Sequence, residues 1–121
     1  MRLFALRGAT TAPENTSDAI RGATEELMRE IVERNALEID DVVSCLFTVT
    51  DDLDADFPAA AARQVGFSQV PLLCAREIPV PGALPSVIRV LVHYYAPEDR
   101  RPTHVYLRDA VALRRDLEEA N

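Results

Sequence analysis

The chain has 121 residues, 48% of them hydrophobic and 27% charged, which is typical of one soluble globular domain spanning residues 1–121. Its net charge is −7 and its basic residues are all arginines without a basic patch, which argues against nucleic-acid and anionic-membrane binding. No apolar run approaches the roughly 20 residues of a membrane helix. The cysteines Cys45 and Cys74 suggest neither a disulfide framework nor a metal site, so we expect a cytoplasmic protein.

The first part of the chain predicts two strands around one long helix. The stretch "RLFALRGATT" from Arg2 is typical of a strand that meets a turn at Gly8. Thr16 or Ser17 can cap a helix that reaches Asn35. Apolar residues recur along that helix with helical spacing, at Ile20, Ala23, Leu27, Met28 and Ile31. The β-prone stretch "DVVSCLFTVT" then predicts a second strand over 41–50.

The remaining elements complete one sheet. Pro58 begins a short helix that Gly66 ends, and "QVPLLCAREI" over 69–78 predicts the third strand. "LPSVIRVLVHYY" over 84–95 predicts the fourth, and "THVYLRDAVALR" over 103–114 predicts one long or two short final strands with a turn near Asp109. We therefore expect an α+β domain, with an approximately five-stranded mixed sheet and one long and one short helix on one face. The uncovered face is apolar and predicts self-association in a closed symmetric oligomer.

Arg89 lies in the middle of the apolar fourth strand. Side chains alternate along a strand, so Arg89 points to the same face as Val87 and Leu91. A guanidinium on an apolar face is costly unless an anion meets it. The sequence leaves open whether that anion belongs to a ligand, or whether Arg89 forms an internal ion pair or extends to the sheet edge.

Most standard site motifs fail on this chain. Asp52, Asp54 and Asp56 resemble the start of a calcium-binding EF-hand loop, but its glycine and final glutamate positions hold Phe57 and Arg63, so a solvated loop is expected. His93 and His104 lack a third ligand at a suitable spacing, and no nucleophile, phosphate or dinucleotide motif is present.

What remains is a set of arginines in or beside the expected strands. The arginines are Arg7, Arg63, Arg89 and Arg114. Three other residues with polar or ionisable side chains lie near them in the strand pattern: Cys74, Glu77 and Tyr106. Several arginines and one glutamate suit a small polycarboxylate that carries a hydroxyl group. They are equally compatible with separate surface ion pairs, so composition and spacing leave the function open.

Five blocks together are more specific. They are "LRGATT" from Leu6, "TDDLDADFPAAAAR" from Thr50, "VPLLCAREI" from Val70, "GALPSVIRVLV" from Gly82 and "HVYLRDAVALRRDL" from His104. In this order, and over nearly the whole chain, they resemble the AroH class of monofunctional chorismate mutases. The resemblance implies an isomerase that converts chorismate to prephenate in aromatic amino-acid biosynthesis without a metal or organic cofactor. It also implies a homotrimeric pseudo-α/β barrel with active sites between subunits.

The resemblance implies individual roles at matching positions. Arg89 would bond the ether oxygen of the breaking C–O bond, while Arg7, helped by Tyr106, would hold a substrate carboxylate. Glu77 and the Cys74 region would contact the ring hydroxyl, although Cys74 is also compatible with a buried small hydrophobic role.

Further positions would form the pocket wall and its mouth. The wall residues implied by the resemblance are Phe57, Ala59, Leu73 and Leu113. Arg63 and Arg114 would gather substrate at the mouth, or serve only as surface residues. The chain departs from the family pattern at Ala60, where a lysine can stand, and at Leu73, which replaces a polar residue. Both changes bear on substrate capture rather than on the central arginine.

The spacing of Cys74 and Glu77 supports a site between subunits. Residues three apart on a regular strand point to opposite faces, so one monomeric pocket would not use both side chains easily. In the family arrangement one subunit supplies Phe57, Arg63 and Cys74, and its neighbour supplies Arg7, Glu77, Arg89 and Tyr106. The tail after Arg114 is a candidate to close over the pocket.

Two other functions stay open at this point. One is an enamine/imine deaminase-like enzyme on a similar trimer. The other is a non-catalytic trimeric regulator that binds a carboxylated metabolite. The pairing of Glu77 with Arg89 argues against the first, and the full set of polar site residues argues against the second.

Overall fold

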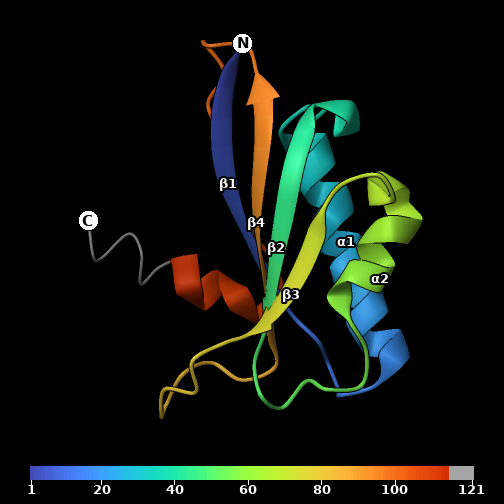
Figure 1. Ribbon diagram of the computed structural model, residues 1–121. Helices are drawn as coiled ribbons and strands as arrows, with labels where there is room; N and C mark the ends of the chain where they lie inside the picture. The colour runs from blue at the N-terminus through green and yellow to red at the C-terminus, as the bar shows by residue number, and fades with distance from the viewer. Residues whose placement is uncertain (115–121) are drawn as a thin grey trace.

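The computed structural model describes residues 1–114 and contains one mixed sheet with helices against one of its faces (Figure 1). The main elements in chain order are β1 (Arg2–Thr11), α1 (Ser17–Arg34), β2 (Val42–Val49), α2 (Pro58–Ala62), β3 (Leu72–Arg76), β4 (Val87–Ala96) and β5 (Val105–Tyr106). The segment 115–121, on which the expectation of a closing tail falls, lies outside the described residues. None of the helices within residues 1–114 combines the length and the apolar character that a membrane span requires.

The five strands lie in the order β3-β2-β4-β1-β5. The central strand β4 is antiparallel to both β1 and β2, whereas β2–β3 and β1–β5 are parallel pairs. This arrangement confirms the predicted five-stranded mixed sheet and the α+β class. Because strands distant in sequence become neighbours, residues from the two ends of the chain meet on one surface.

Helix α1 forms where its sequence predicts. The hydroxyl of Thr16 accepts a hydrogen bond from the Ala19 N–H at 3.1 Å, which satisfies one of the unpaired donors of the first turn. At the other end, the side-chain amide of Asn35 donates to the Ile31 carbonyl and accepts from the Thr103 N–H at 2.7 Å. The last turn of α1 is thereby tied to the segment that leads into β5.

The predicted turn at Gly8 is wrong, because β1 continues unbroken to Thr11 and pairs with β4 along its full length. Gly8 serves a different purpose. A Cβ placed there would lie 2.7 Å from Ile31 Cδ1 and 3.1 Å from Val90 Cγ1. The glycine therefore lets α1 pack directly against the strand backbone.

The prediction of one long or two short final strands is also wrong in extent. Only Val105 and Tyr106 pair with β1. Arg108 then adopts a left-handed φ of 53°, the chain forms a 3-10 turn over Arg108–Ala110, and residues 111–114 continue as helix. The alternating pattern of this segment favoured a strand, but its alanines and leucine are equally good helix formers.

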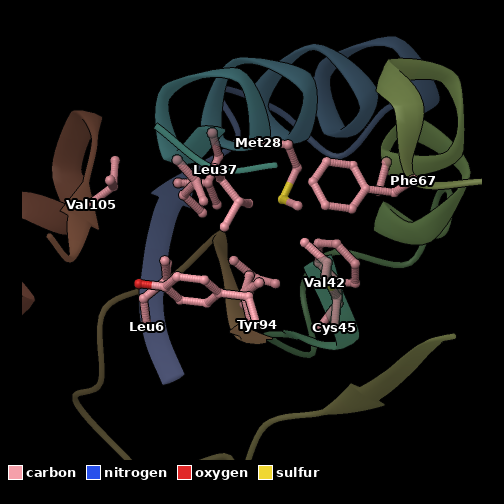
Figure 2. Packing of buried hydrophobic residues seen from close by; sticks show 14 of the residues in the cluster. Leu6, Met28, Leu37, Val42, Cys45, Phe67, Tyr94 and Val105 are labelled. Atoms are coloured by element: carbon pink, nitrogen blue, oxygen red, sulfur yellow. The ribbon is translucent and has the colours of Figure 1, made fainter. Parts of the chain in front are cut away.

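The core lies between the helices and one face of the sheet. Figure 2 shows Met28 and Phe67 on the helix side above Cys45 and Tyr94 of the sheet, all within one buried cluster. The opposite face retains large apolar side chains in solvent. Their exposed fractions are 49% for Leu3, 40% for Leu46, 63% for Leu73 and 45% for Tyr95.

Candidate active site

The uncovered face of the sheet contains a cavity of about 330 Å³ in which Arg7, Arg89 and Tyr106 converge. We call it the arginine cavity; its other lining residues are Gly8, Ala9, Leu46, Thr48, Val90 and Leu91. The register explains the convergence, because Ala9 lies opposite both Arg89 on β4 and Tyr106 on β5, while Arg7 lies opposite Leu91. Residues directly opposite share a face of the sheet.

Arg89 is held by a carboxylate. Its Nε lies 3.0 Å from Oε1 and 3.2 Å from Oε2 of Glu77, and the Thr48 hydroxyl donates to Glu77 Oε2 at 3.1 Å. The Glu77 side chain is only 15% exposed, whereas that of Arg89 is 46% exposed. The pair engages the Nε–H of Arg89, so the other N–H donors of the planar guanidinium are not used by it and can meet a ligand.

The backbone at Arg7 is fixed by a histidine. The Arg7 N–H donates to Nδ1 of His104 at 3.0 Å, which requires that this nitrogen carry no proton. Desolvation lowers the pKa of His104 below its ordinary 6.5, and the positive charge of Arg7 acts in the same direction. The environment thus favours the neutral imidazole that the hydrogen bond needs.

A second cavity, of about 430 Å³, lies between β3 and the loop that precedes α2. We call it the loop-side cavity; it is lined by Val49, Leu53, Asp54, Ala55, Asp56, Phe57, Pro58, Cys74, Ala75 and Arg76. Phe57 is 69% exposed, while Ala59 in the adjoining turn of α2 is buried. Arg63 is exposed at the end of α2, and Ala60 is half-buried.

Cys74 lines the loop-side cavity, whereas Glu77 lies beside the arginine cavity as the partner of Arg89. Cys74 lies opposite the fully buried Phe47 and packs against the core, whereas Glu77 bonds Arg89 on the uncovered face. The structure therefore places the two residues on opposite faces, as their spacing predicted. The residues expected in one pocket are thus divided, within a single chain, between two cavities and the segments beside them.

Six predicted site residues line neither cavity: Ala59, Arg63, Leu73, Glu77, Leu113 and Arg114. Leu73 is exposed on the uncovered face beside Leu46, with which it is in register. Leu113 is half-buried and Arg114 is exposed in the last described helical turn. Within residues 1–114, no group of three His, Cys, Asp or Glu side chains is placed to hold a metal ion.

Sequence reasoning missed Thr48 and His104 as parts of this arrangement. Thr48 lies two residues after Leu46 on β2 and so shares its face, but its proximity to Glu77 depends on β2 lying between β3 and β4. His104 was considered only as a metal ligand. Its role beside Arg7 depends on the parallel pairing of β5 with β1, which local sequence does not encode.

Comparison with known proteins agrees with this fold. A solved structure of a chorismate mutase from Clostridium thermocellum matches it with a TM-score of 0.87 and 48% identity, over 90% of this chain and 98% of that chain. Such a match defines the class as a mixed-sheet α+β protein with the chorismate mutase architecture.

The sequence comparisons are more specific. The family model for chorismate mutase type I matches residues 3–117. Chorismate mutase AroH of Thermus thermophilus is 52% identical over 118 residues, 95% of this chain and 96% of the relative. The AroH enzyme of Bacillus subtilis is 41% identical over 120 residues, 97% of this chain and 94% of the relative. The chain belongs to the chorismate mutase type I family.

Proposed function

We propose that this isomerase, a chorismate mutase, converts chorismate to prephenate in a site that two neighbouring copies of the chain complete. In this intramolecular rearrangement the ether C–O bond breaks while a new C–C bond forms. It needs neither a nucleophile nor a general base. The protein has to hold the compact conformer of a flexible dianion and stabilise the charge that separates as the C–O bond breaks.

The observation that carries the proposal is the contact of Glu77 with Arg89 and Thr48, two residues that line the arginine cavity. Glu77 orients the guanidinium, and the donors of Arg89 not used by the ion pair face the ether oxygen of the substrate. Negative charge grows on that oxygen only as the bond breaks. A fixed guanidinium therefore stabilises the transition state more than the bound substrate, which is the condition for a higher kcat.

Arg7 and Tyr106 line the same cavity and would bind a substrate carboxylate. Arginine suits this role because its planar fork matches the two carboxylate oxygens. Glu77, with an acceptor oxygen beside Arg89, would also receive the ring hydroxyl. These roles require no metal or organic cofactor.

A homotrimer with pseudo-α/β barrel packing would join the two partial sites. The division of predicted residues between two cavities supports this assembly, as do the exposed Leu3, Leu46, Leu73 and Tyr95 on the uncovered face. One subunit would contribute Phe57 and Cys74 of the loop-side cavity, with Ala59 and Arg63 at the adjoining helix α2, to the arginine cavity of its neighbour. The joint pocket would be bordered by Leu73, Leu113 and Arg114. The cytoplasmic location of the protein stays a prediction.

The deaminase-like enzyme and the non-catalytic regulator are not favoured. Both would need another reason for a half-exposed arginine held by a nearly buried glutamate. The family membership reported above also favours the mutase. Imine hydrolysis, or chorismate binding without turnover, would identify the respective alternative.

The test is the loss of chorismate absorbance with purified protein, compared for wild type and Arg89→Ala. We expect turnover by the wild type and a kcat at least ~10²–10³-fold lower in a folded variant, the usual effect of losing one such donor. Arg34→Ala is the matched control, since Arg34 forms an exposed ion pair with Glu30 through its Nε at 2.8 Å on α1. Near-normal turnover by folded Arg89→Ala would disprove the assignment.

A further inference from the structure

The acidic loop that carries Phe57 is fastened to the start of α1. Phe57 is 69% exposed and lines the loop-side cavity. An aromatic ring with so little packing around it takes its position from the backbone that carries it. The contacts that fix the backbone at Phe57 therefore determine the position of the Phe57 ring.

Asp56, the residue before Phe57, makes three short hydrogen bonds. Its Oδ2 accepts from the Ser17 hydroxyl at 2.5 Å and from Arg21 Nε at 2.8 Å, and its Oδ1 accepts from the Phe57 N–H at 2.7 Å. The side chain is 15% exposed. The bonds from Ser17, Arg21 and the Phe57 N–H hold the pKa of Asp56 at about 2.

Asn15 fastens the same loop one step earlier. Its Nδ2 donates to Asp54 Oδ1 at 2.7 Å, and its Oδ1 accepts from the backbone N–H groups of Asp54 and Ala55 at 3.0 and 3.1 Å. The loop is therefore tied to the start of α1 by Asn15 and Asp56. The Asp56 carboxylate joins Ser17 and Arg21 of α1 directly to the Phe57 N–H.

The charge on Asp56 has a second consequence. Asp54 and Asp56 both line the cavity that would meet a dianionic substrate, and a carboxylate there repels such a ligand. The Arg21 guanidinium bonds the same Oδ2 that faces α1 and supplies the opposite charge. The Asp56 carboxylate thus remains a strong hydrogen-bond acceptor for the Phe57 N–H, while the positive charge of Arg21 compensates its negative charge.

We propose that Asp56 and Arg21 act as a positioning pair, in which Asp56 sets the Phe57 wall of the joint pocket and Arg21 prevents the Asp56 carboxylate from repelling the substrate. This inference rests on the proposed function, which makes Phe57 a wall of the chorismate site. Neither residue touches the reacting atoms. Their effect is on substrate capture, through geometry for Asp56 and through charge for Arg21.

The kinetic test separates these two effects. Asp56→Ala removes the acceptor and should raise KM about tenfold, with a smaller change in kcat. Asp56→Asn keeps a side-chain oxygen for the Phe57 N–H and should recover most of the loss. Arg21→Gln leaves the carboxylate uncompensated, so its KM should rise mainly at low ionic strength and approach the wild-type value in high salt. Arg34→Gln, on the same helix, is the matched control and should leave KM unchanged.

Amide hydrogen exchange of Phe57 in the intact protein gives a readout independent of activity. We expect exchange about tenfold faster in Asp56→Ala than in wild type, with little change in Asp56→Asn and Arg34→Gln. Unchanged exchange and KM in folded Asp56→Ala would overturn the inference, as would an Arg21→Gln effect that does not depend on salt. If the wild type failed to turn over chorismate, the proposed function would fail, while the exchange data would still decide whether Asp56 positions Phe57.

Discussion

Arg89 shows why a charged residue occupies an apolar strand. Its ion pair with Glu77 is partly exposed, and pairs of this kind contribute at most about 1 kcal/mol to stability. Such a contribution would not by itself account for a guanidinium at the centre of the sheet. The geometry is more informative, because Glu77 and Thr48 fix the direction of the guanidinium on the face where Arg7 and Tyr106 also lie.

His104 provides a prediction at the residue scale. Its pKa is lowered in the folded chain, so the unfolded chain takes up a proton first as the pH falls below 6.5. The stabilisation from the neutral ring is therefore fully present above pH 6.5 and is lost as the pH falls through the lower, folded-state pKa. An NMR titration should give His104 a pKa below 6.5.

Replacement of His104 by glutamine supplies the control. The stability difference between wild type and His104→Gln, measured by urea unfolding, should be largest above pH 6.5 and shrink as the pH falls. His93 is present in both proteins and cancels from the comparison. A difference that grows toward acid pH would contradict the neutral His104–Arg7 hydrogen bond.

The elements themselves follow largely from local sequence. The apolar period of α1, its Thr16 cap and the β-prone runs of β2 and β4 predict those elements closely. Gly8 and the segment after Tyr106 were misjudged for one reason. A glycine in a strand, and a segment such as 107–114 that mixes alanine, valine and leucine, are each compatible with more than one local structure, and the choice depends on what packs against them.

The two glycines Gly8 and Gly22 give a matched prediction at the scale of the element. Gly8→Ala would place a Cβ 2.7 Å from Ile31 Cδ1, so α1 would have to move from β1, at a cost of about 1–3 kcal/mol. At Gly22, in the exposed interior of α1, a Cβ meets nothing within 4 Å, so Gly22→Ala should stabilise by about 0.5–1 kcal/mol. Urea unfolding of both variants checks the opposite signs. Equal effects at the two positions would refute the close-packing explanation of Gly8.

For the whole molecule, the central feature is that neither cavity alone contains the residues expected in a complete pocket. The uncovered face is also more apolar than a solvated sheet face normally is. Both features have one explanation if copies of the chain associate through that face. Self-association remains a prediction. Its strongest test measures enzyme turnover in mixed oligomers rather than only the size of the oligomer.

Complementation between two inactive variants tests the shared site. One carries Arg89→Ala and the other carries both Phe57→Ala and Arg63→Ala, so each damages a different side of the proposed joint pocket. Random mixed trimers would contain both undamaged halves in about a quarter of their sites and should recover roughly that fraction of wild-type turnover. Co-expressed and co-purified mixtures would be compared with each variant alone. Turnover no greater than that of the separate variants would show that the two cavities do not form one site.

The sequence alone determined the α+β class, the positions of most elements, the face of Arg89 and the family resemblance. These follow from local periodicity, capping residues and motif order, which are properties of neighbouring residues. Only the tertiary structure decided that Glu77 and Thr48 hold Arg89, that His104 meets Arg7, and that Cys74 lines a cavity with Phe57. These contacts depend on the strand order β3-β2-β4-β1-β5. That order is set by which apolar faces bury one another across long stretches of chain, a choice that no local pattern encodes.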